Sequence, residues 1–461
     1  MVFLDGIYYR YYTIFSIVRV MKRFLFEYVP AWLLLMVFGF IVVHAPLTVW
    51  VGTHVPSLAV TIKSWKELLT GLAAILVVIA LYRRHMLGGF ASKPVVAALL
   101  VYIALHLMAM GIYPHGVQQT VAGLMIDLRY VAYFLTVYAF LHLYPQYRQP
   151  FVRIGIVGAV IVVGFAVMEL FLPKDTLAQL GYSKATIQPY LTVDKNPNYV
   201  RYNSTLRGPN PLGAYAIMVL AGVVAYAAAA RQRLRQRRTQ VVLGLLFVAS
   251  AIALWVSYSR SAVIGALIAL GAVVWVVFGL RPTKKIIYTT GVAVLVCGGL
   301  LYAARNTTFV QNVVIHNNPT TGGSIDSNTA HAESLLHGLQ RVGVEPLGAG
   351  IGSTGSASLF GTNSLVIENQ YLMIAHEVGW MGLALFVYAN GLLLVQLYRR
   401  RADWVALAAF SSGIGLAVVG LMLPVWADDT VSIVWWGLAA IALIGGTNGH
   451  RTANQKTKRT A

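Results

Sequence analysis

Four groups of charged side chains stand at the ends of long apolar stretches, where residues of these types could do chemistry together. They lie in the segments RYNSTLRGPN, SYSRSAV, HAESLLHGLQR and ENQYLMIAHE, and are Arg201, Arg207, Arg260, His331, Glu333, His337, Arg341 and Glu368. A guanidinium group stays charged at all ordinary pH values, and its planar fork can bind two phosphate oxygens at once. Several arginines at one membrane surface would therefore suit a lipid diphosphate headgroup. For Arg201 and Arg207 alone, contact with membrane phosphates or nearby carboxylates is an equal alternative.

Glu368 is the candidate for proton transfer. We expect it in the first turn of a helix, where the positive end of the helix dipole favours the ionised carboxylate. An ionised carboxylate can accept the proton of an attacking hydroxyl group; a simple helix-capping acid is the alternative. His331 and His337 are six residues apart and fall on different faces of a helix, so solvated surface histidines are favoured over a metal pair. We predict neither a metal nor a cofactor.

Long apolar runs decide the fold class. The 461 residues are 58% hydrophobic and 11% charged, whereas a soluble domain carries roughly 25% charged residues. Many runs reach the ~20 residues that a helix needs to cross the hydrocarbon core. We predict an all-α polytopic membrane protein whose single transmembrane domain covers residues 1–461. The twelve predicted spans are 29–51, 66–82, 94–112, 119–143, 152–172, 209–230, 240–257, 261–280, 286–304, 366–397, 403–424 and 431–447.

The basic residues give the predicted orientation. The net charge is +20, and most of the excess falls on alternate loops, as the positive-inside rule requires. Both termini are then cytoplasmic, and the charge indicates membrane topology rather than nucleic-acid binding. Arg260 is an exception, because it lies in a tight turn on the outer side, where this bias opposes it. A functional role for Arg260 is therefore favoured.

Two outer segments are too long to be simple turns, and loops of this length are usually functional. The first covers about 173–208. The second covers about 305–365 and includes an amphipathic surface helix near 330–343. Within the spans, charged side chains are costly and should face the bundle interior: Asp127, Arg129 and Glu169. We expect structural ion pairs there, with Arg129 as a further functional candidate.

Four short motifs of this sequence resemble those of the O-antigen ligase and polymerase superfamily of bacterial membrane glycosyltransferases, and they follow one another in the same order as in that family. Its R-x-x-G-T-F-x-x-P-N pattern is similar to 201–210, with Ser204 for Gly and Leu206 for Phe. Its S-R-x-x-x-L turn is similar to 259–264, and its P-L-x-G-x-G segment is matched in part by 346–350. Its H-N-x-x-L segment followed by E-x-G is similar to 368–379, with Glu368 in place of His.

This resemblance implies a GT-C-like fold and a metal-independent, inverting glycan transfer at the outer face of the bacterial plasma membrane. The implied donor is a glycan on undecaprenyl diphosphate, and the implied acceptor is a hydroxyl group of a glycolipid or glycan. The diphosphate would be held by Arg201, Arg207, Arg260 and Asn210. Arg260 would also assist catalysis, with Glu368 as the general base. Secondary candidates for the site are His331, His337, Arg341 and Arg129.

Two other functions remain open from the sequence. A polymerase of the same superfamily would join one lipid-linked glycan to another, and no acceptor motif separates it from a ligase. A transporter or flippase would bind the headgroup without making a bond. The absence of a detectable internal repeat gives no support to an inverted-repeat transporter. The gathering of charged residues at the outer face favours chemistry there.

Overall fold

The computed structural model describes residues 20–230, 236–279, 283–316 and 327–445, and this part of the chain is mostly helical. Within it, nine helical stretches are long and apolar enough to cross a membrane: Val20–His54, Pro56–Arg83, Pro94–Ile112, Val117–Leu143, Pro145–Glu169, Pro209–Ala229, Arg237–Val256, Arg260–Phe278 and Gln370–Arg399. The prediction of an all-α protein embedded in a membrane is confirmed.

Each of the twelve predicted spans overlaps a helix. The first comprises α2 (Val29–Phe40) and α3 (His44–His54), and the others are α4 (Ala59–Arg83), α6 (Pro94–Ile112), α7 (Val117–Leu143), α8 (Arg148–Glu169), α9 (Pro209–Ala229), α10 (Arg237–Val256), α11 (Arg260–Phe278), α12 (Lys284–Ala303), α14 (Gln370–Arg399), α15 (Trp404–Val419) and α16 (Asp429–Leu443). The helices α15 and α16 have 16 and 15 residues, fewer than the ~20 of a straight crossing. The number of crossings stays a prediction.

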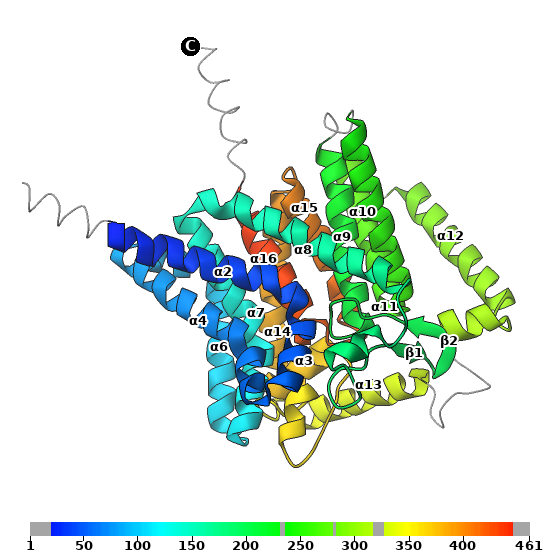
Figure 1. Ribbon diagram of the computed structural model, residues 1–461, viewed down its shortest axis with the longest axis horizontal. Helices are drawn as coiled ribbons and strands as arrows, with labels where there is room; N and C mark the ends of the chain where they lie inside the picture. The colour runs from blue at the N-terminus through cyan, green and yellow to red at the C-terminus, as the bar shows by residue number, and fades with distance from the viewer. Residues whose placement is uncertain (1–19, 231–235, 280–282, 317–326, 446–461) are drawn as a thin grey trace, which may run out of the picture.

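Aromatic side chains fill the centre of the bundle between α7 and α16. Trp436 packs against Tyr130 and Phe134 with ring centroids 5.2 and 5.5 Å apart, and Trp435 lies edge-on to Trp436. Large rings bury much apolar surface and prefer tilted or edge-to-face contacts of this kind. The helices α7 and α16 therefore form the inner layer, whereas α12 stands apart from the other helices at one side of the molecule (Figure 1).

One end of the bundle carries the non-membrane elements. The strands β1 (Leu191–Val193) and β2 (Asn196–Arg201) pair antiparallel there, and α13 (Ser327–Val344) lies across the same end, at the bottom of Figure 1. Val342 of α13 is buried against the start of α14, while the leucines of α13 are exposed: Leu335, Leu336 and Leu339. The helix near the predicted 330–343 thus packs by one edge and leaves its leucine face free. The first residues of α10 and α15 lie at the opposite end.

A kink in α14 is held by the glycine-rich loop that precedes it in the chain. The helix departs from helical geometry at Val378 and Gly379, where Gly379 has a φ of 72°. The Trp380 amide donates to the Pro346 carbonyl (3.0 Å), and the Gly350 amide donates to the Glu377 carbonyl (3.1 Å). A Cβ on Gly379 would lie 2.7 Å from a backbone atom of Leu347. The loop and the kink therefore fit together only because glycine occupies this position.

Candidate active site at one end of the helical bundle

Arg201 joins three elements at the end of the bundle that carries α13. It is the last residue of β2, and its Nη2 donates to Asn210 Oδ1 (2.6 Å) in the first turn of α9. Its Nε donates to the Ser257 carbonyl (3.0 Å) at the end of α10. Burial and the charge of Arg260 lower the pKa of Arg201 to about 10, an effect that Asp194 partly offsets. Arg201 therefore stays charged at neutral pH and lies close to a second guanidinium group.

Arg260 is that second guanidinium, and it lies in the predicted turn between two helices. It begins α11 after a turn in which Tyr258 takes a positive φ of 47°. Its Nη1 donates to the carbonyls of Val314 (3.1 Å) and Ile315 (3.0 Å). Arg260 thus binds the first part of the long segment that leads to α13.

His316, directly after this segment, is a site residue that the sequence analysis missed. It is 6% exposed, and in the described part of the chain its Nε2 has no hydrogen-bond partner. Burial first, then the charges of Arg260, Arg201 and His331, lower the pKa of His316 to about 3. A neutral imidazole therefore lies beside the two guanidinium groups of Arg201 and Arg260. No spacing in the surrounding sequence, VVIHNN, could have indicated it.

Glu368 contacts His331 of α13 directly. The Glu368 backbone amide also donates to Ser334 Oγ (2.9 Å), so α13 holds this residue at two points. The hydrogen bond from His331 lowers the pKa of Glu368, which keeps the carboxylate ionised near neutral pH. Both side chains are partly open to solvent, at 41% and 38% exposure. An accessible carboxylate paired with imidazole can take up a proton.

The predicted place of Glu368 in the first turn of α14 is wrong. The helix begins at Gln370, and Asn369 caps it by accepting hydrogen bonds from the amides of Tyr371 and Leu372 (both 3.0 Å). Asparagine is a preferred N-cap residue because its side-chain oxygen satisfies free amides of the first turn. Asn369 therefore performs the capping role that we considered for Glu368.

The remaining candidates on α13 lie elsewhere. Arg341 Nη1 is 3.8 Å from Glu345 Oε1, one helical turn further along, and Glu345 Oε2 is 3.2 Å from His376 Nδ1. His337 is six residues from His331 and so falls on another face of the helix. The structure thus brings His331, rather than His337 or Arg341, to Glu368.

Arg207 and Arg129 gather at a different place, around the start of α16. The charges of both act on the Asp428 carboxylate, whose pKa burial and the neighbouring Asp429 raise to about 6. Arg129 Nη2 donates to the Ala427 carbonyl. A turn at Ser204 separates Arg207 from Arg201, so that the two side chains have different neighbours. Ser204 has a φ of 54°, and its amide donates to Glu169 Oε2 (2.8 Å). The chain turns sharply between the two arginines.

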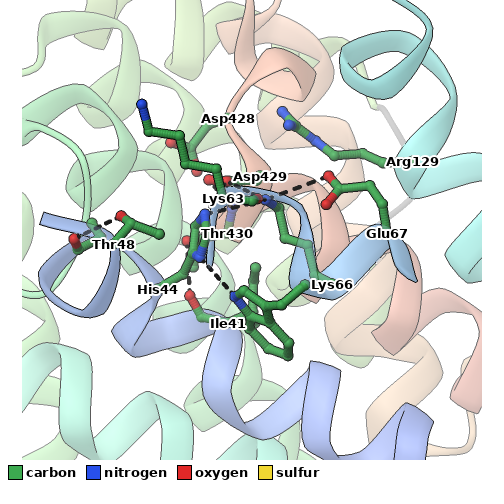
Figure 2. A network of polar contacts seen from close by, with 12 residues as sticks. Ile41, His44, Thr48, Lys63, Lys66, Glu67, Arg129, Asp428, Asp429 and Thr430 are labelled. Atoms are coloured by element: carbon green, nitrogen blue, oxygen red, sulfur yellow. Dashed lines mark hydrogen bonds and ion pairs between the residues drawn. The ribbon is translucent and has the colours of Figure 1, made fainter. Parts of the chain in front are cut away.

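A buried network beside Asp428 was also missed (Figure 2). His44 Nε2 and Lys66 Nζ lie 3.0 and 3.3 Å from Asp429 Oδ2, and all three residues are at most 5% exposed. Trp65 Nε1 donates to His44 Nδ1 (3.0 Å). Because an indole N–H can only donate, the ring hydrogen of His44 lies on Nε2, facing Asp429. Ionisable groups within a membrane domain are a signal for function. Two of these residues, His44 and Lys66, lie inside predicted spans, and Asp429 lies just before one, so the apolar pattern did not single them out.

The prediction of a structural ion pair for Asp127 is wrong for the described residues, where Asp127 contacts the carboxyl group of Glu377 and no cation is its ion-pair partner. Both residues are buried. Glu377 Oε1 also accepts a hydrogen bond from the Thr354 amide (3.3 Å). Glu169 likewise has a backbone amide as its described partner. These acids connect helices to loop backbone at the same end of the bundle.

No protein-family model and no curated protein sequence match this chain. Function is therefore inferred from the geometry and the motifs. Within the described residues, no three His, Cys, Asp or Glu side chains converge in a way that could hold a metal ion.

Proposed function

We propose that the protein is an O-antigen-ligase-like glycosyltransferase. It would move a glycan from an undecaprenyl-diphosphate carrier to an acceptor hydroxyl of a glycolipid or glycan, with inversion and without a metal. The proposal includes a GT-C-like fold with twelve crossings and both termini in the cytoplasm of a bacterium. The site would then face the extracytoplasmic side of the plasma membrane.

One observation supports this proposal most: Arg201, Arg260 and His331 all lie close enough to His316 to lower its pKa, and His331 contacts Glu368. Residues more than 160 positions apart in the chain thus supply cations and a carboxylate to one region. Phosphate-binding groups beside a proton acceptor are what a transfer from a lipid diphosphate needs.

The reaction follows from these groups. The acceptor oxygen attacks the anomeric carbon, and the bond between that carbon and the diphosphate oxygen breaks. The acceptor proton passes to the His331–Glu368 pair, in which Glu368 is the base. The lipid diphosphate leaves with the electron pair, and the charges of Arg201 and Arg260 stabilise it, which is where fixed cations help most. Asn210 orients Arg201, and Arg207 stays a prediction for the diphosphate site.

A polymerase of the same superfamily would use the same groups with a lipid-linked glycan as acceptor. A second candidate of another class is a transporter for lipid-linked sugars. The buried network of His44, Lys66 and Asp429 favours it, because ionisable groups within membrane helices commonly form relay paths in transporters. The pairing of Glu368 with His331 at the bundle end favours the transferase.

The test uses purified protein, a lipid-linked oligosaccharide and candidate acceptors. We expect product that persists in EDTA and disappears in Arg260→Ala and Glu368→Gln. The matched controls are Arg305→Ala and Glu333→Gln, two exposed residues of the same segment, which should retain turnover. Movement of a fluorescent lipid-linked sugar across proteoliposomes without a new glycosidic bond would establish the transporter and overturn the transferase.

A further inference from the structure

A mainly apolar cleft of about 460 Å³ lies among the membrane helices, away from the candidate active site. Its floor is formed by buried side chains of three helices, Phe151, Tyr215 and Ile441. Its rim includes Ile156 of α8 and Val242 of α10, which are 46% and 62% exposed. The cleft is therefore open at the side of the bundle, between α8 and α10. In a membrane protein, this surface meets hydrocarbon chains.

The length of the cleft matches one leaflet. Its lining on α9 runs from Tyr215 to Tyr226, a rise of about 16 Å at ~1.5 Å per residue. Half of the hydrocarbon core is about 15 Å. The chain of a lipid from a single leaflet can therefore lie along it.

The polar end of the cleft is where the headgroup of such a lipid would be. Arg238 is exposed in the first turn of α10, and Trp404 begins α15. Trp404 meets Tyr226 edge-on, with ring centroids 5.2 Å apart. Tryptophan and tyrosine favour the depth of lipid headgroups, and a basic side chain at a cleft between helices favours an anionic headgroup. This mouth lies at the bundle end opposite to α13, and hence opposite to Arg201 and Arg260.

We propose that an anionic glycerophospholipid occupies this cleft, with one chain against Phe151 and Tyr215 and its phosphate at Arg238. The position of the basic mouth argues against the isoprenoid chain of the glycan donor, whose diphosphate would lie at the other end. Only this argument against the donor chain rests on the proposed transferase function; lipid binding in the cleft does not depend on it or on which face of the membrane is cytoplasmic.

Gly222 offers a direct way to block the cleft. It lines the cleft, and in the described part of the chain a Cβ built on it has no atom within 4 Å apart from its chain neighbours and the nearby backbone of its own helix. A leucine there begins in open space at the cleft, and replacing a helical glycine favours the helix. Gly244 of α10 is the matched control, because it is exposed and has the same open space around it in the described structure. For Arg238, the control is Arg399, exposed in the last turn of α14.

The experiment counts lipids on the intact, detergent-purified protein by native mass spectrometry, after exchange with phosphatidylglycerol or phosphatidylcholine. Wild type, Gly244→Leu and Arg399→Gln should retain one phosphatidylglycerol in preference to phosphatidylcholine. Arg238→Gln should lower this preference about fivefold, and Gly222→Leu should lose both lipids while remaining monodisperse. Equal retention of both lipids by wild type, or full retention by Gly222→Leu, would overturn the proposal. Displacement of phosphatidylglycerol by undecaprenyl phosphate, from wild type and from Gly244→Leu alike, would also overturn it.

Discussion

The two groups of charged residues in this protein differ in what surrounds their cations. At the bundle end beside α13, Arg201 and Arg260 hydrogen-bond neutral amide and carbonyl oxygens, and Arg260 lowers the pKa of Arg201. In the buried network, Lys66 lies within 3.4 Å of both Asp429 and Glu67. Two guanidinium groups close together suit an anionic ligand, whereas a lysine held between two carboxylates within helices suits a structural or relay role. Burial alone does not distinguish the two.

The largest expected effect is on the buried network. Lys66→Met leaves the Asp429 carboxylate buried without its cation, and breaking a buried ion pair in this way costs about 3–5 kcal/mol. Thermal unfolding in mild detergent measures the loss. Lys63→Met is the control, because Lys63 is exposed and gives the network only its backbone carbonyl. The double variant Lys66→Met/Asp429→Asn should regain part of the stability; equal melting of Lys66→Met and Lys63→Met would show that the pair is not structural.

Replacing Arg260 or Arg207 should have a smaller effect in free energy, and this effect is on turnover rather than on stability. Arg260→Ala should lower kcat by about 10²-fold, the usual result of removing one group that stabilises charge in the transition state, and leave the melting temperature nearly unchanged. Arg207→Ala should reduce turnover less, because the described neighbour of Arg207 is Asp428. Transfer assays on both variants under the same conditions make the comparison. A larger loss in Arg207→Ala would move the diphosphate site toward α16.

The third prediction concerns pH. The His331 hydrogen bond lowers the pKa of Glu368, so the carboxylate stays ionised as pH falls until that lowered pKa is reached. In His331→Ala the pKa of Glu368 rises, and the acid limb of the kcat profile should move to higher pH. His337→Ala is the matched control on the same helix. Superimposable profiles for the two variants would remove His331 from the proton-transfer pair.

The last expected effect is on stability at acid pH, and it is absent at neutral pH. The pKa of His316 is about 3 in the folded protein, below its ordinary value of 6.5. As pH falls from 6.5 toward 3, the unfolded chain takes up a proton that the folded chain does not, and the free energy of unfolding decreases. His316→Gln removes this contribution, so its melting temperature should depend less on pH over that range than that of wild type. A parallel dependence in both proteins would contradict the burial of a neutral imidazole.

The predictable and unpredictable parts of this molecule differ in the range of the interactions that determine them. Apolar runs predict helices because the signal is local, and the positions of α4 to α16 follow the predicted spans closely. The network of His44, Lys66 and Asp429 joins residues 385 positions apart, and no local pattern identifies such partners. Arg201 and Arg207 are only six residues apart, yet the turn at Ser204 sends them to different neighbours. Sequence motifs gave the types of residue at the site, and tertiary packing gave their partners.

The kink at Gly379 makes the first part of α14, Gln370 to Val378, a lever with the catalytic candidate just before its first residue. Glu368 lies two residues before Gln370, and the helix from Gln370 to the kink is roughly 14 Å long at ~1.5 Å per residue. A tilt of about 4° at this hinge displaces the carboxylate by about 1 Å, a misplacement that is enough to cost ~10² in rate. The Pro346–Gly350 loop binds the kink through hydrogen bonds of the Gly350 and Trp380 amides. These hydrogen bonds therefore help to fix the position of the Glu368 side chain, which the loop does not contact.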